Sequence, residues 1–294
     1  MTTTVGLVEE LWRFPVKSMS GTRLDEVTVT ERGLLGDRAY ALIDVETGKV
    51  ASAKSVRVFP DLLMCRAAFV EPPLADGSIP PVRIELPSGQ SVTSDSSDAD
   101  RTLSAYWRRD VHLAQLAPDD FTIDQYHPDV AGADPGGRRG IVVPQKLGAA
   151  LFAELGAPSP VPAGAFFDVC PLSLITTSTL ARLQALQPHS LVDSRRFRMN
   201  LVIRTGQPDF VENGWVGHRL ACADTRIDVA MPDPRCVMTT LPQDGLPHDT
   251  DVLRALVAHN RLEVAGGQFP CAGVYAVVAA SGMVRVGDSI VMVA

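Results

Sequence analysis

Four short segments of the sequence combine cations, hydroxyl groups and a cysteine in a way that a hydrophobic core does not require. They are 14–21 (FPVKSMSG), 33–40 (GLLGDRAY), 195–200 (RRFRMN) and 233–240 (DPRCVMTT). Arginine and lysine side chains recognise phosphate groups, and a cysteine thiolate is a ligand for soft metals. Plain structural roles are the alternatives. Cys236 could pack as a small buried hydrophobe, and Arg38 and Arg198 could form strand-edge ion pairs with neighbouring aspartates.

The sequence lacks the motifs of several large enzyme classes. It contains no GxGxxG, GxxxxGK[ST], GxSxG or HExxH pattern, so nucleotide-binding folds, esterases and zincins lose their usual support. The six histidines are dispersed along the chain, and the acidic pair at 119–120 lies in a polar segment. We therefore expect neither a multi-histidine metal site nor a glycosidase-type pair of carboxylates.

The cysteine pattern indicates a reducing compartment. The chain has five cysteines, an odd number, and it has no CxxC pair. Neither a disulfide framework nor zinc-ribbon spacing is present. The cytoplasm is therefore the expected location.

The length and the charge balance exclude further classes. The 294 residues allow one large domain or two modest ones. With 27 Lys and Arg against 34 Asp and Glu, the net charge is −7 and the pI is near 5.4, which argues against a general nucleic-acid or anionic-membrane surface. The longest apolar run, 274–280, is far shorter than the roughly 20 residues that span a bilayer. Glu9 and Glu10 interrupt the first hydrophobic patch, which argues against a secretory signal.

The first 115 residues alternate short strand-like runs with turns, a pattern typical of a small β-barrel or sandwich. Turn residues at 46–48 and 87–89 predict hairpins. The only run there that predicts a helix is 98–109. The predicted strands of this part are 5–14, 24–30, 38–44, 49–53, 62–70, 82–86 and 111–116.

From 117 to about 165 the composition shifts to Pro, Gly, Asp and Ala, which predicts a linker or a mobile loop. Beyond it the pattern predicts helices at 178–186 and 249–260, the first of them capped by a hydroxyl within 176–178. The predicted strands of this part are 172–175, 197–204, 215–221, 226–231, 235–239, 274–279, 283–286 and 289–293.

The number and order of the motifs resemble the MOSC-domain family, whose domain also forms the C-termini of molybdenum-cofactor sulfurases. More specifically, the chain looks like the two-part members with an N-terminal MOSC β-barrel, such as the amidoxime-reducing component and bacterial N-hydroxylated-base reductases. The resemblance covers nearly the whole chain. The matching motifs are FPVKS at 14–18, GDR at 36–38, VASAK at 50–54, PDLL at 60–63, FRMN at 197–200, RCVMTT at 235–240 and VGD at 286–288.

The resemblance implies an α+β fold that is mostly β and has three parts. The first is an N-terminal MOSC β-barrel domain over residues 1–116. A linker or lid loop over residues 117–165 follows it. The third part is a MOSC β-barrel core over residues 166–294 with a few flanking helices.

The resemblance also implies a pyranopterin molybdenum cofactor (Mo-molybdopterin). Cys236 matches the cysteine that supplies a thiolate to molybdenum, so it is the expected metal ligand and catalytic residue. Cations would hold the terminal phosphate, and an asparagine could read the edge of the pterin ring. The expected cofactor-binding residues in the matching motifs are Lys17, Ser18, Arg38, Arg198, Asn200 and Arg235.

Two further candidates lie in the loop before the strand predicted at 172–175. Relatives carry a small polar residue there that faces the cofactor, which makes Cys170 a candidate cofactor contact. Asp168 is a candidate catalytic residue for handling the substrate or a proton. Both could equally be ordinary turn residues. Pro234, Met199 and Met19 depart from the family pattern, which leaves the choice of substrate open.

The function implied by the resemblance is that of a molybdenum oxidoreductase. It would reduce small N-oxygenated compounds (amidoximes, hydroxylamines, N-hydroxylated bases), with two electrons and two protons releasing water. No residue is assigned as the general acid. Because the cysteines are not clustered, we expect no iron–sulfur cluster in this chain and an electron donor in trans, a ferredoxin or a flavoprotein reductase.

Two other functions remain open at this point. In one, a carrier protein uses Cys236 to transfer sulfur or molybdenum cofactor. In the other, a non-catalytic binding module retains a vestigial site.

Overall fold

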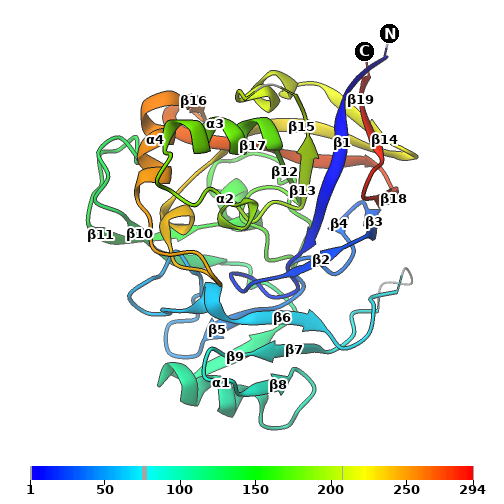
Figure 1. The fold of residues 1–294 in the computed structure, drawn as a ribbon. Helices are drawn as coiled ribbons and strands as arrows, with labels where there is room; N and C mark the ends of the chain where they lie inside the picture. Colours follow the sequence, from blue (N-terminus) through cyan, green and yellow to red (C-terminus); the bar gives the residue numbers. More distant parts are fainter. Residues whose placement is uncertain (1, 75–77, 207, 294) are drawn as a thin grey trace.

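A closed β-barrel of seven strands forms the larger part of the molecule (Figure 1). The computed structural model describes residues 2–74, 78–206 and 208–293. The strands follow one another around the barrel in the order β12, β13, β1, β19, β14, β15, β17, and the pairing of β17 with β12 closes it. Their bounds are β1 (Thr2–Arg13), β12 (Leu172–Thr176), β13 (Leu201–Arg204), β14 (Arg219–Cys222), β15 (Thr225–Pro234), β17 (Gly267–Ala280) and β19 (Ser289–Val293).

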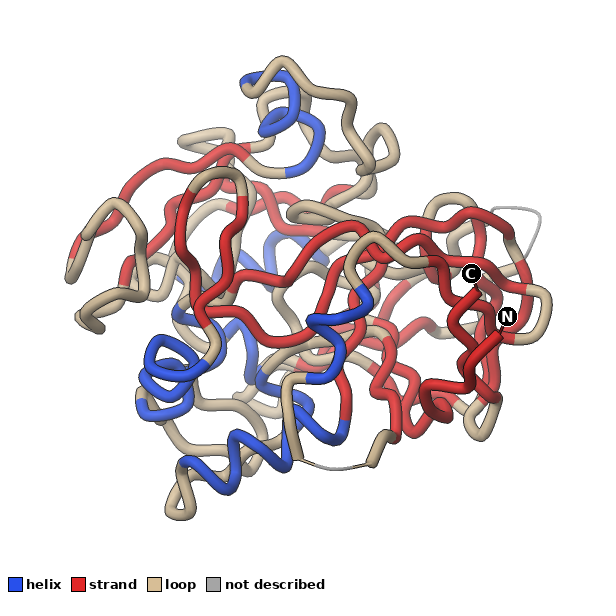
Figure 2. The backbone as a smooth tube through the Cα atoms, turned by 90° about the horizontal axis from the view of Figure 1, so that it is seen from above, coloured by secondary structure: helices blue, strands red, loops and turns tan. Residues whose placement is uncertain are grey.

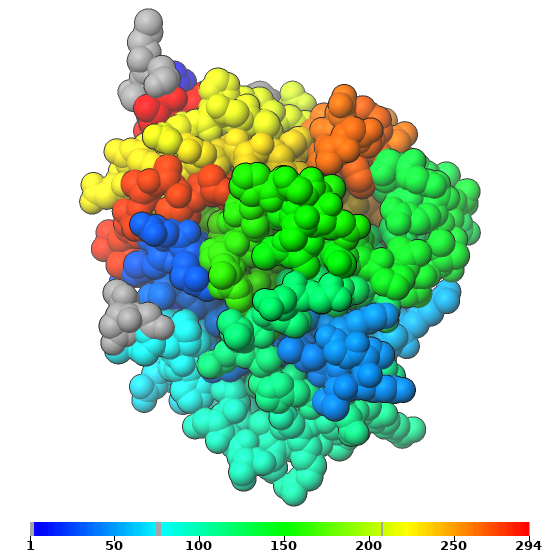
Figure 3. Space-filling view, turned by 180° about the vertical axis from the view of Figure 1, so that it is seen from behind, coloured from blue at the N-terminus to red at the C-terminus, as the bar shows by residue number. Residues whose placement is uncertain are grey.

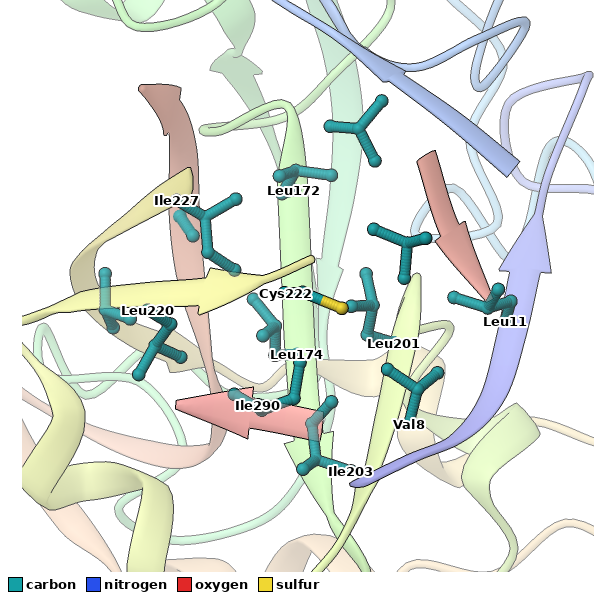
Figure 4. Close-up of a cluster of buried hydrophobic side chains, with 14 of the residues drawn as sticks. Val8, Leu11, Leu172, Leu174, Leu201, Ile203, Leu220, Cys222, Ile227 and Ile290 are labelled. Carbon is teal, nitrogen blue, oxygen red and sulfur yellow. The ribbon is translucent and has the colours of Figure 1, made fainter. Parts of the chain in front are cut away.

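The first strand of the chain completes a barrel whose other six strands come from the second half of the sequence. β1 lies between β13 and β19, and it is antiparallel to both. The two ends of the chain therefore lie on neighbouring strands (Figure 2). Val8 and Leu11 of β1 are buried in the barrel core with Leu174, Ile203 and Ile290 (Figure 4). Burial of these aliphatic side chains is what holds the distant segments together.

A second hydrophobic core lies among smaller sheets built from residues 16–114 (Figure 1). Along β7 the buried Val82 and Ile84 alternate with exposed residues, as period-two patterning requires. The elements of this part are β5 (Ala41–Asp44), η1 (Leu62–Met64), β6 (Arg66–Phe69), β7 (Val82–Glu85), β8 (Ser91–Thr93), α1 (Ala99–Trp107) and β9 (Val111–Ala114). The three strands before them, β2 (Thr22–Leu24), β3 (Glu26–Thr30) and β4 (Gly33–Leu34), pack against the barrel core instead, and β2 pairs with β1. The prediction of a mostly β fold with an N-terminal β-barrel domain is confirmed.

The Pro- and Gly-rich segment 117–165 contains regular structure. It forms the hairpin of β10 (Thr122–His127) and β11 (Ile141–Lys146), followed by α2 (Gly148–Glu154). Lys49 Nζ lies 2.6 Å from Asp124 Oδ1, so the hairpin contacts the N-terminal part, and Figure 3 shows these two segments side by side. The division of the chain at 116 and 165, and a lid role for the segment, stay predictions.

The remaining helices cover the outside of the barrel. Thr176 caps α3 (Thr177–Leu186) as predicted, because its hydroxyl accepts a hydrogen bond from the Thr179 amide. α4 (Asp251–His259) packs against α3 and β17. The other short elements are η2 (Ser194–Arg196), η3 (Val211–Trp215), η4 (Val237–Thr240), β16 (Arg261–Val264) and β18 (Gly282–Arg285).

The predicted strand at 49–53 is wrong. Only Val50 forms a bridge there, with Ile43, and Ser52 then accepts a backbone hydrogen bond from Ser55 that turns the chain. The turn stops the ladder because Ser52 bonds within its own segment instead of to a neighbouring strand. As a result, Lys54 leaves the sheet and reaches the interior of the molecule, where its side chain is 13% exposed.

A buried carboxyl group links two barrel strands, β12 and β17, to the helix α3. Glu212 of η3 is fully buried, and it accepts hydrogen bonds from the hydroxyls of Thr176 (2.6 Å) and Thr179 (2.7 Å) and from the amide of Gly273 (3.1 Å). We expect Glu212→Ala to lower the free energy of unfolding by about 3 kcal/mol, because three buried donors lose their acceptor. Urea denaturation measures this loss.

Glu212→Gln is the matched control because it keeps the volume and one acceptor oxygen. Burial raises the pKa of Glu212 above its ordinary value of 4.5, so the folded state holds the proton to a higher pH than the unfolded state. In the native protein this group therefore lowers stability as the pH rises above 4.5, and Glu212→Gln removes that dependence. Equal stability of the Ala variant and the native protein would contradict the assignment.

Candidate functional site

All nine candidate site residues line one open cavity of about 740 Å³, a volume that includes solvent at its mouth. They come from separate stretches of chain: the turn after β1, the approaches to β5, β12 and β13, and the turn after β15. The nine are Lys17, Ser18, Arg38, Asp168, Cys170, Arg198, Asn200, Arg235 and Cys236. The fold therefore brings together residues that lie up to 219 positions apart in the sequence.

Backbone pairing places the first two segments side by side. The amide of Arg38 donates to the carbonyl of Phe14, and the amide of Lys17 donates to the carbonyl of Tyr40. Ser18 and Arg38 adopt left-handed conformations (φ 66° and 47°), and so does Arg198 (φ 55°). Non-glycine residues in this region are strained, and such strain is concentrated at functional sites.

The cavity is strongly basic although the chain carries a net charge of −7. Six cationic side chains line it, and only two carboxyl groups do. The cations are Lys17, Arg38, Lys54, Arg196, Arg198 and Arg235, and the carboxyl groups are Asp168 and Asp233. A cleft lined by one sign of charge attracts a ligand of the opposite sign, so the cavity is suited to an anion.

Two guanidinium groups converge at one aromatic ring. Arg38 and Arg198 lie 4.6 Å and 4.3 Å from the centre of the Phe14 ring. Arg38 also forms an ion pair with Asp37, whereas Arg198 donates to the carbonyl of Met19 at 2.6 Å. Burial, with the nearby charge of Arg38, lowers the pKa of Arg198 to about 9. Asp37 is one anion next to this pair of arginines. A further anion, supplied by a ligand, would reduce the repulsion between Arg38 and Arg198.

Asp168 joins two lysines from different segments. It forms ion pairs with Lys17 and, at 2.7 Å, with Lys54. Burial acts to raise the pKa of Asp168, but the two ammonium groups lower it well below its ordinary value. For Lys17, burial lowers the pKa to about 8, and the charge of Asp168 acts in the opposite direction. Asp168 therefore stays ionised near neutral pH and holds no proton to donate.

Cys236 lies in a turn and not in the strand predicted over 235–239, so that prediction is wrong. The ladder of β15 ends at Pro234, and the chain then forms η4. The hydroxyl of Thr239 donates to the carbonyl of Cys236 at 3.0 Å, and Thr240 bonds the carbonyl three residues before it. Such local side-chain bonds compete with a strand ladder and favour a turn. The turn leaves Cys236 partly exposed, whereas the other four cysteines are buried.

Two arginines hold the backbone around Cys236. Arg235 donates to the carbonyls of Ala272 and Phe197, both at 2.9 Å. Arg196 is 1% exposed and donates to the carbonyls of Thr239 (3.3 Å) and Pro247 (2.9 Å). These bonds consume most donors of both groups, so Arg196 and Arg235 position the loop of Cys236.

The side chain of Asn200 has no vacant hydrogen-bonding position. Its Oδ1 accepts bonds from the amide and the hydroxyl of Ser173, both at 3.2 Å. Its Nδ2 donates to Asp37 Oδ2 at 2.9 Å and to the carbonyl of Trp12 at 3.3 Å. An amide side chain can form four such bonds, and all four are used.

Several residues that line the cavity were not among the predicted site residues, including Lys54, Ser173, Asp233 and Tyr275. For two of these residues the sequence contains a feature that could have identified them. Lys54 is one of four lysines and ends a family motif, and Asp233 begins the segment that contains Cys236. Ser173 and Tyr275 have no such feature, because they belong to ordinary strands.

Asp233 is the second carboxyl group of the cavity and differs from Asp168. It is 2% exposed, forms an ion pair with Arg235 through Oδ2, and leaves its buried Oδ1 without a hydrogen-bond partner. Burial raises the pKa of Asp233 to about 7, although Arg235 and the Tyr275 hydroxyl act against the rise. Both oxygens of Asp168 are thus in ion pairs, whereas Oδ1 of Asp233 can still accept a hydrogen bond.

The donor set fits a metal that arrives with ligands of its own. Within residues 2–74, 78–206 and 208–293, no group of three or more His, Cys, Asp or Glu side chains could hold a bare metal ion. A pyranopterin supplies a dithiolene, so one thiolate from Cys236 would suffice on the protein side. The orphaned oxygen of Asp233 and the basic cavity would meet the polar and anionic parts of such a ligand.

Comparison with known proteins identifies both parts of the chain. Residues 5–115 match the MOSC N-terminal beta barrel domain, and residues 162–291 match the MOSC domain. The human mitochondrial amidoxime-reducing component 1 is 24% identical over 303 residues, which cover 97% of this chain and 82% of that protein. The mitochondrial amidoxime reducing component 2 of Bos taurus is also 24% identical, over 97% of this chain and 83% of that protein.

The solved structures that match the chain are more distant in sequence. The YUAD protein from Bacillus subtilis is 12% identical with a TM-score of 0.45, over 99% of this chain and 97% of that one. YiiM from Escherichia coli is 14% identical with a TM-score of 0.32, over 42% of this chain and 54% of that one. None of the helices in the described part of the chain has the length and apolar character needed to span a membrane.

The two domain matches together cover most of the sequence, in the order expected from the motifs. The chain therefore belongs to the MOSC-domain proteins that carry an N-terminal MOSC β-barrel domain, and it is homologous to the mitochondrial amidoxime-reducing components.

Proposed function

We propose that the protein is a molybdenum-cofactor-dependent oxidoreductase that reduces N-oxygenated compounds such as amidoximes, hydroxylamines and N-hydroxylated bases. One observation carries the proposal: the partly exposed thiol of Cys236 opens into a cavity lined by six cations. A soft thiolate beside a basic cleft matches a metal carried by an anionic dithiolene ligand. The names of the homologous amidoxime-reducing components support the reaction class.

Different residues would bind the phosphate and the metal of the cofactor. Lys17, Arg38 and Arg198 would hold the terminal phosphate. Lys17 and Arg38 each have a carboxylate partner, whereas Arg198 donates to a carbonyl and has none in the described part of the chain. Cys236 would bind the metal. When bound, the cofactor supplies the two-electron chemistry that removes oxygen from the substrate.

Residues around these ligands would set their positions. The peptide of Ser18 has the strained conformation that turns the chain at the cavity, and Cys170 lines the wall. Asp168 orients Lys17 and Lys54 through its two ion pairs. The electrons would come from a separate donor protein of the ferredoxin or flavoprotein-reductase type, and the protein would act in the cytoplasm.

The test uses the full chain produced in a host that makes the cofactor. We expect near-stoichiometric molybdenum per chain by elemental analysis and a matching amount of pterin by fluorescence after release. The same preparation should reduce a model amidoxime with a chemical reductant. A well-folded protein with neither molybdenum nor pterin would refute the proposal.

A carrier function is the second candidate, and the exposure of Cys236 favours it. Transfer of sulfur or cofactor requires an exchangeable thiol, and Cys236 is the only cysteine of this chain that is not buried. A carrier would show a persulfide on Cys236 after labelling with a sulfane-specific reagent, and it would not turn over an amidoxime. Turnover with stoichiometric metal would exclude it.

A further inference from the structure

A buried oxygen in the cavity has no hydrogen-bond partner. Oδ1 of Asp233 is inaccessible to solvent and makes no hydrogen bond within the described residues, while Oδ2 pairs with Arg235. Leaving a buried carboxyl oxygen unpaired is costly, so natural proteins rarely retain one without use. Asp233 lies three residues before Cys236 and lines the same cavity. A ligand in that cavity can supply the missing donor.

The neighbours of Asp233 do not fill this position. Arg235, Lys54 and Asp168 act on its carboxyl group by charge, and the Tyr275 hydroxyl acts on it by hydrogen bonding. A hydroxyl donates only one hydrogen bond and a carboxylate has about four acceptor positions, so Tyr275 does not saturate the group. Arg235 uses its remaining donors on the carbonyls of Ala272 and Phe197 and on the sulfur of Met199. Lys54 is paired with Asp168 at 2.7 Å.

The residue first expected to read the pterin ring has no capacity left. All four hydrogen bonds of Asn200 go to protein groups. A ligand edge could bond to Asn200 only by breaking one of them. Oδ1 of Asp233 can accept a hydrogen bond from the ligand without breaking an existing one.

We propose that Asp233, through its Oδ1 and with the hydroxyl of Tyr275 beside it, binds the N–H donors on the pyrimidine edge of a pterin. This inference rests on the proposed function and adds a binding residue to it. A pterin presents an amino group and a ring N–H side by side. Oδ1 of Asp233 can accept one of these donors, and the oxygen of the Tyr275 hydroxyl can accept the other. The oxygen can accept in both protonation states of Asp233.

Charge separates this position from the phosphate position. A phosphate near Asp233 would be repelled by the carboxylate and is better held by Arg38 and Arg198. An uncharged ring edge with N–H donors meets no repulsion. The chain therefore offers distinct residues for the anionic part and for the ring of one ligand.

The experiment compares two small ligands on the cofactor-free full chain. The first is pterin, and the second is lumazine, in which an oxygen replaces the 2-amino group. Both are titrated by fluorescence, with no metal or phosphate present. We expect the native protein to bind pterin roughly tenfold or more tightly than lumazine, the ratio for losing one hydrogen bond to a charged group. Asp233→Asn should bring this ratio close to one, because its amide can donate to the lumazine oxygen.

Asp228→Asn is the matched control. Asp228 lies on the same strand and pairs with Arg219 at the surface, so its change should keep the native ratio. Equal binding of both ligands to the native protein, or a ratio that survives Asp233→Asn, would overturn the inference. If Asp233→Asn does not fold, the inference is tested by the ratio of pterin to lumazine affinity in the native protein and in Tyr275→Phe. Tyr275→Phe should lower the ratio, and an unchanged ratio would remove Tyr275 from the assignment.

Failure here differs from failure of the proposed function. Stoichiometric molybdenum and pterin with no dependence on residue 233 would leave the function standing and refute this role of Asp233. Absence of molybdenum and pterin would refute the function, whatever the small-ligand ratio.

Discussion

Cys236→Ser is expected to lose molybdenum while the protein stays folded. A serine hydroxyl remains protonated at neutral pH and is a hard oxygen donor, so it cannot replace a soft thiolate. Changes merely next to a metal ligand cost about 10–100-fold in metal affinity, and loss of the ligand itself should cost at least as much. Amidoxime reduction should fall with the metal content. Elemental analysis of the purified variant measures the loss.

The pterin content should fall less than the molybdenum content in this variant. The cations that would hold the phosphate, Lys17, Arg38 and Arg198, are unchanged. Cys65→Ala is the control, because Cys65 is buried in the N-terminal core and does not line the cavity. It should keep the metal. Full molybdenum occupancy in Cys236→Ser would show that the metal does not depend on this thiol.

Asp168→Asn is expected to destabilise the fold strongly. The carboxylate neutralises Lys17, which is 6% exposed, and Lys54, which is 13% exposed. Removing one partner of a buried ion pair leaves uncompensated charge, at a cost of about 3–5 kcal/mol. Asp124→Asn is the control, because it breaks the more exposed pair with Lys49 and should cost less than about 1 kcal/mol. Urea unfolding of both variants gives the comparison.

The pH dependence of stability checks the same assignment. The pKa of Asp168 is lowered in the folded state, so its contribution to stability is present above its unfolded value of about 3.9 and is lost as the pH falls below it. Asp168→Asn should lack this acid-side loss. Lys17 acts on the alkaline side. Its folded pKa of about 8 is below the ordinary 10.5, so the unfolded state binds more protons between these values and stability rises with pH there.

In Asp168→Asn the rise on the alkaline side should begin at a lower pH. Asp168 acts to raise the pKa of Lys17, and the variant removes that effect. Identical stability profiles of the variant and the native protein from acid to alkaline pH would show that Asp168 does not neutralise the lysines.

The elements that the sequence predicted well are those with local signals. A strand-like run next to the turn residues at 87–89 predicted β7, and the hydroxyls within 176–178 predicted the start of α3. The hairpin of β10 and β11 was missed, because its Pro- and Gly-rich connection suggested an irregular segment. A hairpin is stabilised by cross-strand contacts that composition does not reveal.

The strand predicted at 235–239 failed for a related reason. Val237 and Thr239 favour a strand, but the pairing of β15 with β17 ends at Pro234 and Cys271, and beyond that point β17 pairs with β16 instead. The threonine hydroxyls therefore bond to their own backbone and form η4. This turn is what exposes Cys236.

The motifs of the sequence determined which residues meet at the cavity, because their types and order identify a family and a family shares its fold. Only the tertiary structure decided what each residue has left to offer a ligand. Asn200 and Asp233 are both short polar side chains beside a strand end, and nothing in their sequence context separates them. Packing saturates Asn200 and leaves one oxygen of Asp233 unpaired. Hydrogen-bond capacity and pKa depend on neighbours that are distant in the sequence, and these neighbours exist only once the chain has folded.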